Sequence, residues 1–329
     1  MNQPTTRRAL VGAFAAAALL GAGPALAQQY PARPITVIVP FAAGGPTDVL
    51  ARIVTQRMSR SLGQTMVVEN VGGAGGTIGV VRGARAAPDG YTLTVGHLGT
   101  HVSNIALYRR LQYDPQTDFE PIAPLGVNPM ILVAKRGAPA TVPEFLAHVR
   151  ANQERLSYGH AGIGSASHTA ALMFHAATGT KVQDVAYRGT GPAMNDLVAG
   201  QFDYMIDQAL NVLQQVQGGT VLGIAVTTPE RLPQVPNLPT LAESGLTGFD
   251  VAIWNTLFAP KGTPQPILER LNAAAAEAMA DPAIRTRLTE LAVQIPSEAE
   301  LKLGAFKARH AADVARWVPV IRAAGATAE

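Results

Sequence analysis

The stretch ITVIVPFAAGGPTDVLARIV, residues 35–54, decides the fold class of this chain. Its first five residues are all β-branched, which predicts a buried strand over 35–39. The apolar spacing that follows predicts a helix over about 46–62. Pro46 suits the first helical position, because an N–H there would have no helical partner, and Gly45 then serves as the N-cap. A strand that turns through glycines into a helix is the repeating unit of α/β proteins.

The same alternation of strands and helices continues along the chain. Short apolar runs predict further strands at 66–70, 91–96, 156–160, 182–187, 202–207 and 221–227. Helical spacing between these runs predicts helices at 77–87, 165–178, 190–199 and 209–217. Such alternation favours parallel or mixed sheets that are covered on both faces, so we expect an α/β fold.

Two extended, proline-punctuated passages, 118–137 and 228–264, flank the second series of strands and helices. This organisation is expected of a chain that leaves one domain, builds another and returns. The Ala-rich C-terminal part predicts three helices that pack on the first domain, at 266–280, 282–291 and 297–317. We therefore expect domain 1 to combine 28–130 with 254–329, and domain 2 to span 131–253.

The first 27 residues have the pattern of a signal peptide. Arg7 and Arg8 precede an apolar run, and Ala25-Leu26-Ala27 fits the small-x-small cleavage pattern, so we expect cleavage after Ala27. The alternative is an uncleaved membrane anchor, for which Pro24 and the Ala/Gly richness are unfavourable. The paired arginines leave both Sec and twin-arginine export open.

Charge and composition exclude several classes of protein. The 26 basic and 23 acidic residues nearly balance, and loss of Arg7 and Arg8 with the signal peptide brings the two counts still closer. No basic face for nucleic acid is therefore expected. The chain has no cysteine, which excludes disulfides, thiolate nucleophiles and Cys-ligated metals.

Five glycine-rich turns each follow a predicted strand and precede a predicted helix, at 39–52, 70–79, 97–101, 160–168 and 187–194. None contains the Gly-Lys-Ser/Thr or G-x-G-x-x-G pattern of a nucleotide site. In a parallel sheet all five would lie at the carboxyl ends of the strands, where open α/β sheets bind ligands. Helix N-termini and hydroxyl groups that point into one crevice favour a carboxylate, with no buried arginine required. For the turn at 70–79, a tight turn between closely packed backbones is the favoured alternative.

Several individual side chains allow two roles. Asp48 can reach back to backbone donors at the start of its own helix or contact a ligand. His168 can donate to a ligand carboxylate or satisfy a helix start. Asp207 can meet a ligand amino or hydroxyl group or cap the next helix. Trp254 fits the core better than a role in closing the crevice.

The patterns of catalytic and metal sites are missing from the sequence. His97 and His101 have the spacing of a metal pair on one helix face, but Gly99 between them argues against a helix. No serine lies in a G-x-S-x-G motif, and no nucleophile, base and orienting group can be assembled. We therefore expect neither an enzyme nor a metal or cofactor site.

Several segments together resemble one protein family. In order they are YPARPITVIVPFAAGGPTDVLARIV (30–54), VVENVGGAGGTIG (67–79), APDGYTL (87–93), YDPQTDFEPIA (113–123), VAYRGTGPAMNDLVAGQFDYMID (185–207), AVTTPERLPQVPNLPTLAESGLTGFDV (225–251) and WNTLFAPKGTP (254–264). They are similar to the substrate-binding proteins of tripartite tricarboxylate transporters, often called Bug-type receptors. The resemblance covers nearly the whole chain after the signal peptide.

This resemblance implies a type II periplasmic-binding-protein fold, in which two α/β domains joined by two crossover strands close around a small organic acid. It also implies a monomer in the periplasm that delivers the acid to the membrane subunits of the transporter. A ligand-presenting sensor component for a two-component system is the alternative, and an enzyme ranks third.

By resemblance, the ligand carboxylate is held on the first domain by Phe41, Ala43, Gly44, Gly45, Thr47, Asp48, Thr100 and His101. The opposite wall consists of Ser165, Ser167, His168, Tyr187, Gly189 and Asp207. The sequence departs from the usual family pattern at His160, Ile163, Gln208 and Leu222. All but Leu222 belong to the wall that is expected to set ligand identity.

Overall fold

A computed structural model describes residues 30–247 and 249–323, so the predicted signal peptide lies outside the described residues. The described residues from 33 onward form one compact unit, and the architecture below is that of this unit. The described residues that precede it, 30–32, include a cis peptide bond between Tyr30 and Pro31. In the described part of the chain, no helix combines the length and apolarity needed to cross a bilayer.

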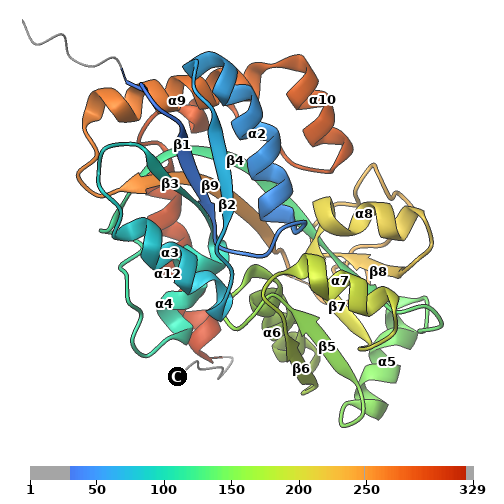
Figure 1. The fold of residues 1–329 in the computed structure, drawn as a ribbon. Helices are drawn as coiled ribbons and strands as arrows, with labels where there is room; N and C mark the ends of the chain where they lie inside the picture. The colour runs from blue at the N-terminus through green and yellow to red at the C-terminus, as the bar shows by residue number, and fades with distance from the viewer. Residues whose placement is uncertain (1–29, 248, 324–329) are drawn as a thin grey trace, which may run out of the picture. The chain divides into compact units, whose positions relative to one another are not determined.

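The first half of the sheet is built on three parallel strands. β1 (Ile35–Val39) lies between β2 (Met66–Asn70) and β3 (Thr92–His97). β9 (Ala252–Pro260) runs antiparallel to β3, and the first part of β4 (Phe119–Ala134) runs antiparallel to β9. Figure 1 shows this half with helices packed against both faces of the strands.

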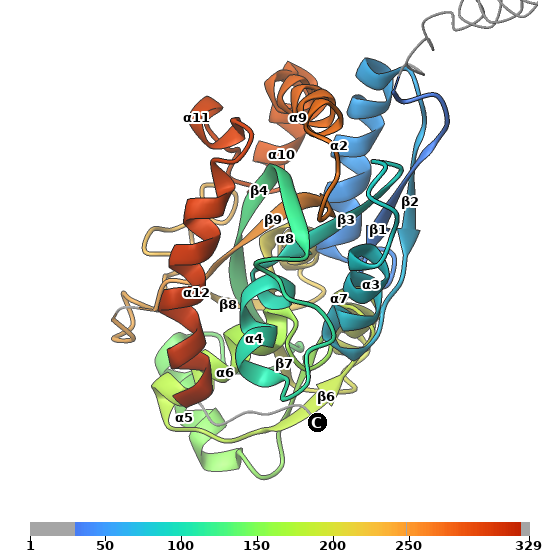
Figure 2. The ribbon, with the colours of Figure 1, turned by 90° about the vertical axis from the view of Figure 1, so that its left-hand side faces the viewer.

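Helices follow these strands as the sequence predicts. α2 (Pro46–Leu62) and α3 (Thr77–Ala84) connect the three parallel strands, and α4 (Asn104–Leu107) follows β3. The C-terminal helices are α9 (Gln265–Ala280), α10 (Pro282–Glu290), α11 (Glu298–Leu301) and α12 (Phe306–Ala323). α2 packs on α9 and α10, whereas α12 packs on α4 (Figures 1 and 2).

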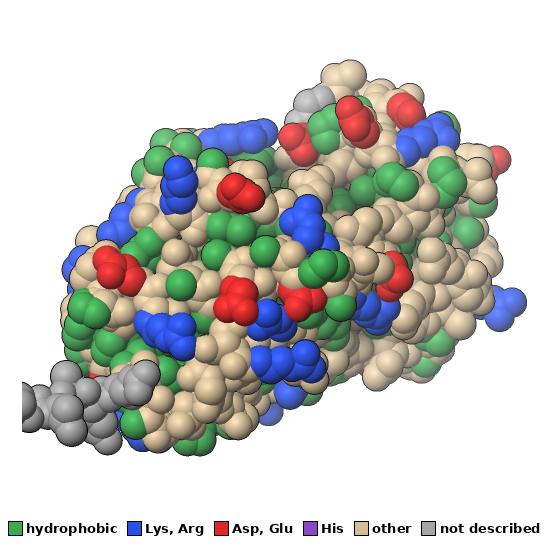
Figure 3. All heavy atoms as spheres, turned by 90° about the horizontal axis from the view of Figure 1, so that it is seen from above, with side chains coloured by type: hydrophobic (Ala, Val, Ile, Leu, Met, Phe, Trp, Pro, Cys, Tyr) green, Lys and Arg blue, Asp and Glu red, His purple; other side chains and the backbone are tan. Residues whose placement is uncertain are grey.

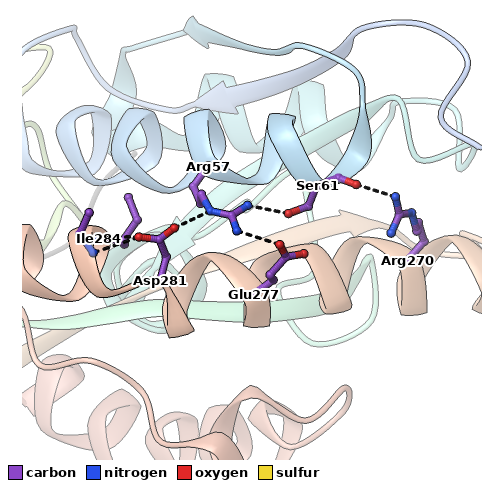
Figure 4. A network of polar contacts seen from close by, with 7 residues as sticks. Arg57, Ser61, Arg270, Glu277, Asp281 and Ile284 are labelled. Atoms are coloured by element: carbon purple, nitrogen blue, oxygen red, sulfur yellow. Dashed lines mark hydrogen bonds and ion pairs between the residues drawn. The ribbon is translucent and has the colours of Figure 1, made fainter.

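A polar network fixes α2 against the C-terminal helices (Figure 4). The Arg57 guanidinium donates to Glu277 and to Asp281, each over 2.7 Å, and to Ser61 over 2.8 Å. Asp281 also caps α10 by accepting from the backbone N–H groups of Ala283 and Ile284. One arginine of α2 therefore ties this helix to α9 and α10, which are remote from it in sequence.

Basic and acidic side chains are interspersed on the face drawn in Figure 3. Ion pairs such as Arg82 with Glu69, and Lys261 and Lys307 with Glu120, compensate charge at the surface. Exposed pairs of this kind contribute little to stability.

The second half of the sheet uses the remaining part of β4 together with β5 (Ser157–His160), β6 (Gln183–Ala186), β7 (Tyr204–Gln208) and β8 (Leu222–Val226). The order is β8-β4-β7-β5-β6, with β5 parallel to β6 and β7. The helices of this half are α5 (Val142–Asn152), α6 (Ala166–Thr178), α7 (Thr190–Val198) and α8 (Ala209–Gln217).

Strand β4 belongs to both halves. It pairs with β9 from Phe119 to Pro129 and with β7 from Met130 onwards. Parallel and antiparallel strands thus share one continuous sheet, and the predicted α/β class is confirmed. The exact domain boundaries near 130 and 253 stay a prediction.

Trp254 is buried in the core, as the sequence favoured, where it packs against Phe306 and donates from Nε1 to Asp313 over 2.8 Å.

Two stretches of helix differ from the predicted elements. The expected helix at 297–317 is two helices, α11 and α12, because the chain turns between them through Gly304, which has a φ of +84°. Helix α5 was not expected, although Thr141 caps it by accepting from the Glu144 N–H.

Candidate ligand-binding site

A cavity lies where helices α2, α6, α7 and α8 begin. It is lined by Phe41, Gly45, Pro46, Thr47, His97, Ala161, Ser165, Ala166, Ser167, Thr190, Asp207 and Gln208. The volume of the cavity is only about 20 Å³. The walls are therefore close together. Among the described residues that line the cavity, none is Lys or Arg.

The helix starts supply backbone donors to this cavity. Pro46 has no N–H, and the N–H groups of Thr47 and Asp48 have no partner among the hydrogen bonds of the described residues. The helix dipole adds partial positive charge at the same place. α6 begins after Ser165 and α7 after Gly189, so their first N–H groups meet the same space. The arrangement favours an anion and offers it uncharged donors.

Asp48 is held in place by three partners. It accepts from the Gly44 N–H over 3.0 Å, from Asn70 over 2.9 Å and from the Arg52 guanidinium. Burial alone would raise the pKa of this carboxyl, but the hydrogen bonds from Arg52, Gly44 and Asn70 outweigh it and hold the pKa below its usual value. Of the two roles considered for Asp48, the geometry favours hydrogen bonding at the start of its own helix over direct contact with a ligand.

Two serines on the opposite wall leave one hydroxyl proton unused. Ser165 Oγ accepts from the His168 N–H, and Ser167 Oγ accepts from the Ala161 N–H. The two hydroxyls also share one hydrogen bond of 3.1 Å, which uses one of their two protons. Whichever serine donates within the pair, the proton of the other can serve a ligand.

His97 and Thr100 fix the turn after β3. His97 Nδ1 accepts from the Gly99 N–H over 2.9 Å and from the Thr100 N–H over 3.3 Å. Thr100 Oγ1 in turn accepts from the His97 N–H and lies 2.9 Å from His101 Nδ1. Burial lowers the pKa of His97 to about 4, so its ring is neutral at pH 7.

His101 lies behind the cavity wall. Its ring is fully buried and stacks on Phe258, with 4.3 Å between the ring centroids. Burial, with His310 and His97 nearby, holds its pKa well below the usual value. The His310 ring nitrogen lies 2.8 Å from the His101 carbonyl oxygen, and donates to it. This surrounding is typical of a core residue.

Asp207 contributes a carboxylate at the end of β7. Its side chain is buried and accepts from Asn211 Nδ2 over 2.6 Å. Burial raises its pKa to about 6, against the lowering effect of hydrogen bonds from Asn211, the Gln208 N–H and Thr190. The next residue, Gln208, caps α8 and accepts from Asn255 Nδ2 over 3.2 Å. Thr47 Oγ1 lies 3.5 Å from Asn255 Oδ1, so a chain of polar contacts joins two residues of the cavity lining, Thr47 and Gln208, through Asn255.

Glycines allow the two halves to approach closely around the cavity. The Ala42 N–H donates to the Arg188 carbonyl over 3.0 Å. A Cβ on Gly72 would lie 2.9 Å from that carbonyl oxygen, and a Cβ on Gly75 would overlap the carbonyl oxygen of Ile163. The turn at 70–79 therefore serves close backbone packing, which was the favoured interpretation.

The structure gathers part of the predicted site in one place. Six of the predicted residues line the cavity: Phe41, Gly45, Thr47, Ser165, Ser167 and Asp207. Ala43 and Gly44 line a neighbouring groove with α7 and α8, and Gly189 caps α7 against Ala42. Asp48, Thr100, His101 and His168 are buried without lining the cavity, and the Tyr187 hydroxyl donates to Asp196. Whether each contacts a ligand stays a prediction.

His168 lies behind the wall formed by Ser165 and Ser167. Its Nδ1 accepts from the Gly164 N–H over 3.2 Å. Burial, with His160 nearby, lowers its pKa to about 3. The contact supports the second role considered for this side chain, in which it satisfies the start of a helix.

Some lining residues were not among the predicted site residues. His97 ends strand β3 and Thr190 opens helix α7. Gln208, which departs from the usual family pattern, was expected on this wall, and it lines the cavity. The argument that selected Asp207 from its place at a strand end applies equally to His97. No group of three or more metal-ligating side chains is clustered among the described residues.

The sequence matches a family model over residues 50–326, described as the tripartite tricarboxylate transporter family receptor. The chain belongs to this family. The expected membership is thereby confirmed, and the protein is a receptor of the periplasmic solute-binding type. The family consists of binding proteins and not of enzymes, as the sequence indicated.

Solved structures of similar proteins agree with the receptor's fold. The periplasmic binding protein BugD is 41% identical with a TM-score of 0.88, over 91% of this chain and 100% of BugD. MatC from Rhodopseudomonas palustris, with bound malate, is 42% identical with a TM-score of 0.87, over 89% of this chain and 100% of MatC. Another R. palustris protein, with adipate, is 33% identical with a TM-score of 0.85, over 90% of this chain and 98% of its own. The expected two-domain periplasmic-binding-protein fold is confirmed.

Proposed function

We propose that this receptor captures a small organic carboxylate in the cavity where α2, α6, α7 and α8 begin, and delivers it to a tripartite tricarboxylate-type membrane transporter. The observation that carries the proposal is the convergence of helix N-termini on a cavity whose lining, as far as the chain is described, contains no Lys or Arg. Each N-terminus favours negative charge, and its hydrogen bonds gain strength when the walls exclude water. The acids bound to MatC and to the R. palustris relative with adipate support this ligand class.

A thermal-shift screen of organic acids with the purified protein tests capture. We expect one or a few acids to bind with micromolar or lower dissociation constants, where 1 μM corresponds to about −8.2 kcal/mol. Such an acid at 100 times its dissociation constant adds about 2.7 kcal/mol of stability, which is a clear shift. No shift with any acid of a broad panel would contradict the proposal.

Delivery is tested separately, in cells. Deletion of the membrane subunits of the transporter is expected to abolish uptake of the acid that the purified receptor binds. Uptake that persists at the wild-type rate would contradict delivery while leaving capture intact.

A further inference from the structure

His97 ends strand β3 and forms part of the cavity wall. Its Nδ1 accepts hydrogen bonds from the backbone N–H groups of Gly99 and Thr100. A ring nitrogen that accepts two N–H groups must present its lone pair to them, so the proton of the neutral ring lies on Nε2. The turn that His97 holds therefore also sets its tautomer.

The ring of His97 is fixed in position as well as in tautomer. It stacks on the Phe41 ring, with 4.9 Å between centroids and 14° between planes. Among the described residues, none forms a hydrogen bond with Nε2 of His97. This nitrogen is nevertheless not fully buried. Nε2–H therefore borders the open space of the cavity. It offers a directed donor without a positive charge, since burial keeps the ring neutral.

Asp207 offers the opposite chemistry. It is the only acidic residue among the described residues that line the cavity. Asn211 engages Oδ2, and the carboxyl is mostly ionised at pH 7 because its pKa is about 6. An ionised carboxylate accepts hydrogen bonds and repels a second carboxylate, and more strongly where water is excluded.

The narrow cavity brings both groups within reach of one small molecule. Donors from the start of α2 and from His97 lie on the first half, and the Asp207 acceptor lies on the second. A ligand that satisfies both walls needs an acid group and, close to it, a hydrogen-bond donor. A plain acid of the same length brings Asp207 no donor beyond those that the protein supplies, and faces it with like charge.

We propose that the ligand is a short hydroxy or amino acid, whose carboxylate accepts from His97 Nε2–H and whose hydroxyl or ammonium group donates to Asp207. This inference rests on the proposed capture of a carboxylate in the same cavity. His97 and Asp207 are then the residues that set the ligand class.

Calorimetry with matched pairs of acids at pH 7.5 tests the inference on the purified protein. The pairs are lactate with propionate, malate with succinate, and aspartate with succinate, so that hydroxyl and ammonium donors are compared separately. In at least one pair, the member with the donor is expected to bind about 10- to 100-fold more tightly, as one hydrogen bond to a charged group allows.

Three variants assign the effect to the two residues. Asp207→Asn removes the negative charge, and is expected to bring the ratio of the affinities for the two acids of a pair close to one. His97→Asn keeps an acceptor for the Gly99 N–H but lacks Nε2–H. It is expected to weaken the binding of both acids of a pair about tenfold and to leave the ratio of their affinities unchanged. Asp184→Asn removes a carboxylate that contacts His160 outside the cavity, and is expected to change neither quantity.

The outcomes separate this inference from the proposed function. Equal affinities for the two acids of every pair would overturn the proposed contact between Asp207 and the ligand's donor. An affinity ratio that is unchanged in Asp207→Asn would overturn it as well. Unchanged affinities in a folded His97→Asn variant would overturn the part of His97. Both results leave capture of an acid intact, whereas no binding by any acid contradicts the proposed function and this inference together.

Discussion

The backbone N–H of Ala42 donates to the carbonyl of Arg188 over 3.0 Å, and so joins the loop before α2 to the loop before α7. Both loops border the cavity, because Phe41 lies in its lining on one side and Thr190 on the other. The two halves are thus held together at the mouth of the candidate site by main-chain atoms. Affinity for a ligand should depend on contacts that favour this closed arrangement.

Tyr108 makes a second contact of this kind. Its hydroxyl lies 2.8 Å from the Ala74 carbonyl oxygen and 2.9 Å from that of Ile163, which belongs to the other half. Tyr108→Phe is expected to weaken acid binding about three- to tenfold, since one hydrogen bond that favours closure is lost. Calorimetry on a variant whose thermal midpoint shows it to be folded checks this. Wild-type affinity would exclude Tyr108 from closure.

Gly75 should be more sensitive than any side chain nearby. It has a φ of +61°, and a Cβ there would overlap the carbonyl oxygen of Ile163, so Gly75→Ala is expected to block closure and reduce affinity more than tenfold. Gly63→Ala is the matched control, because Gly63 has a φ of +68° with no atom close to the added carbon. It should lose about 1 kcal/mol of stability and keep its affinity. Equal affinities in the two variants would contradict the steric explanation.

The buried carboxyl of Asp207 predicts a pH-dependent stability. Its folded-state pKa is about 6, above the ordinary value of 3.8 for an aspartate, so the folded state prefers the protonated form. Its contribution to stability is complete below pH 3.8 and is lost as the pH rises through 6. Asp207→Asn is therefore expected to raise the free energy of unfolding by about 3 kcal/mol at pH 8 and by little at pH 4.

Denaturant unfolding at both pH values measures this difference. Asp184→Asn should change stability in the opposite direction, because the hydrogen bond with His160 lowers the pKa of Asp184. Its contribution is present above the ordinary pKa and is lost as the pH falls through the folded-state value. A gain in stability for Asp207→Asn that is as large at pH 4 as at pH 8 would refute the role of ionisation.

The N-terminal segment predicts the mass of the mature protein. Export with cleavage after Ala27 leaves Gln28 as the first residue, because Ala25 and Ala27 occupy the small-residue positions of the cleavage pattern. Intact-mass measurement of the protein recovered from the periplasm checks this. A protein that keeps residues 1–27 would support the membrane-anchor alternative.

Local patterns predicted much of the fold. α2 begins and ends where Pro46 and the apolar spacing place it, and α8 covers its predicted range. Strand-helix alternation is a local property of the sequence, and so are proline at a helix start and β-branched runs. Gly304 was not recognised as a break because an isolated glycine is tolerated in many helices.

The site was harder to predict because it depends on contacts between remote segments. Thr100 and His101 follow a strand, as cavity residues do, yet His101 stacks on Phe258 of β9 and turns away from the cavity. His97 was considered only as half of a metal pair, which the sequence argued against, and the turn that it holds through the Gly99 N–H became visible only in the structure. The sequence also could not show that Gly75 meets Ile163.

The central claim is that uncharged donors at converging helix starts hold an acid group. A crystal structure with a bound acid from the screen tests it most directly. The account predicts carboxylate oxygens within hydrogen-bonding distance of N–H groups at the start of α2, in the cavity that Thr47 and Ser165 line, with no Lys or Arg side chain in contact. A carboxylate held by a Lys or Arg side chain, or bound outside this cavity, would contradict it.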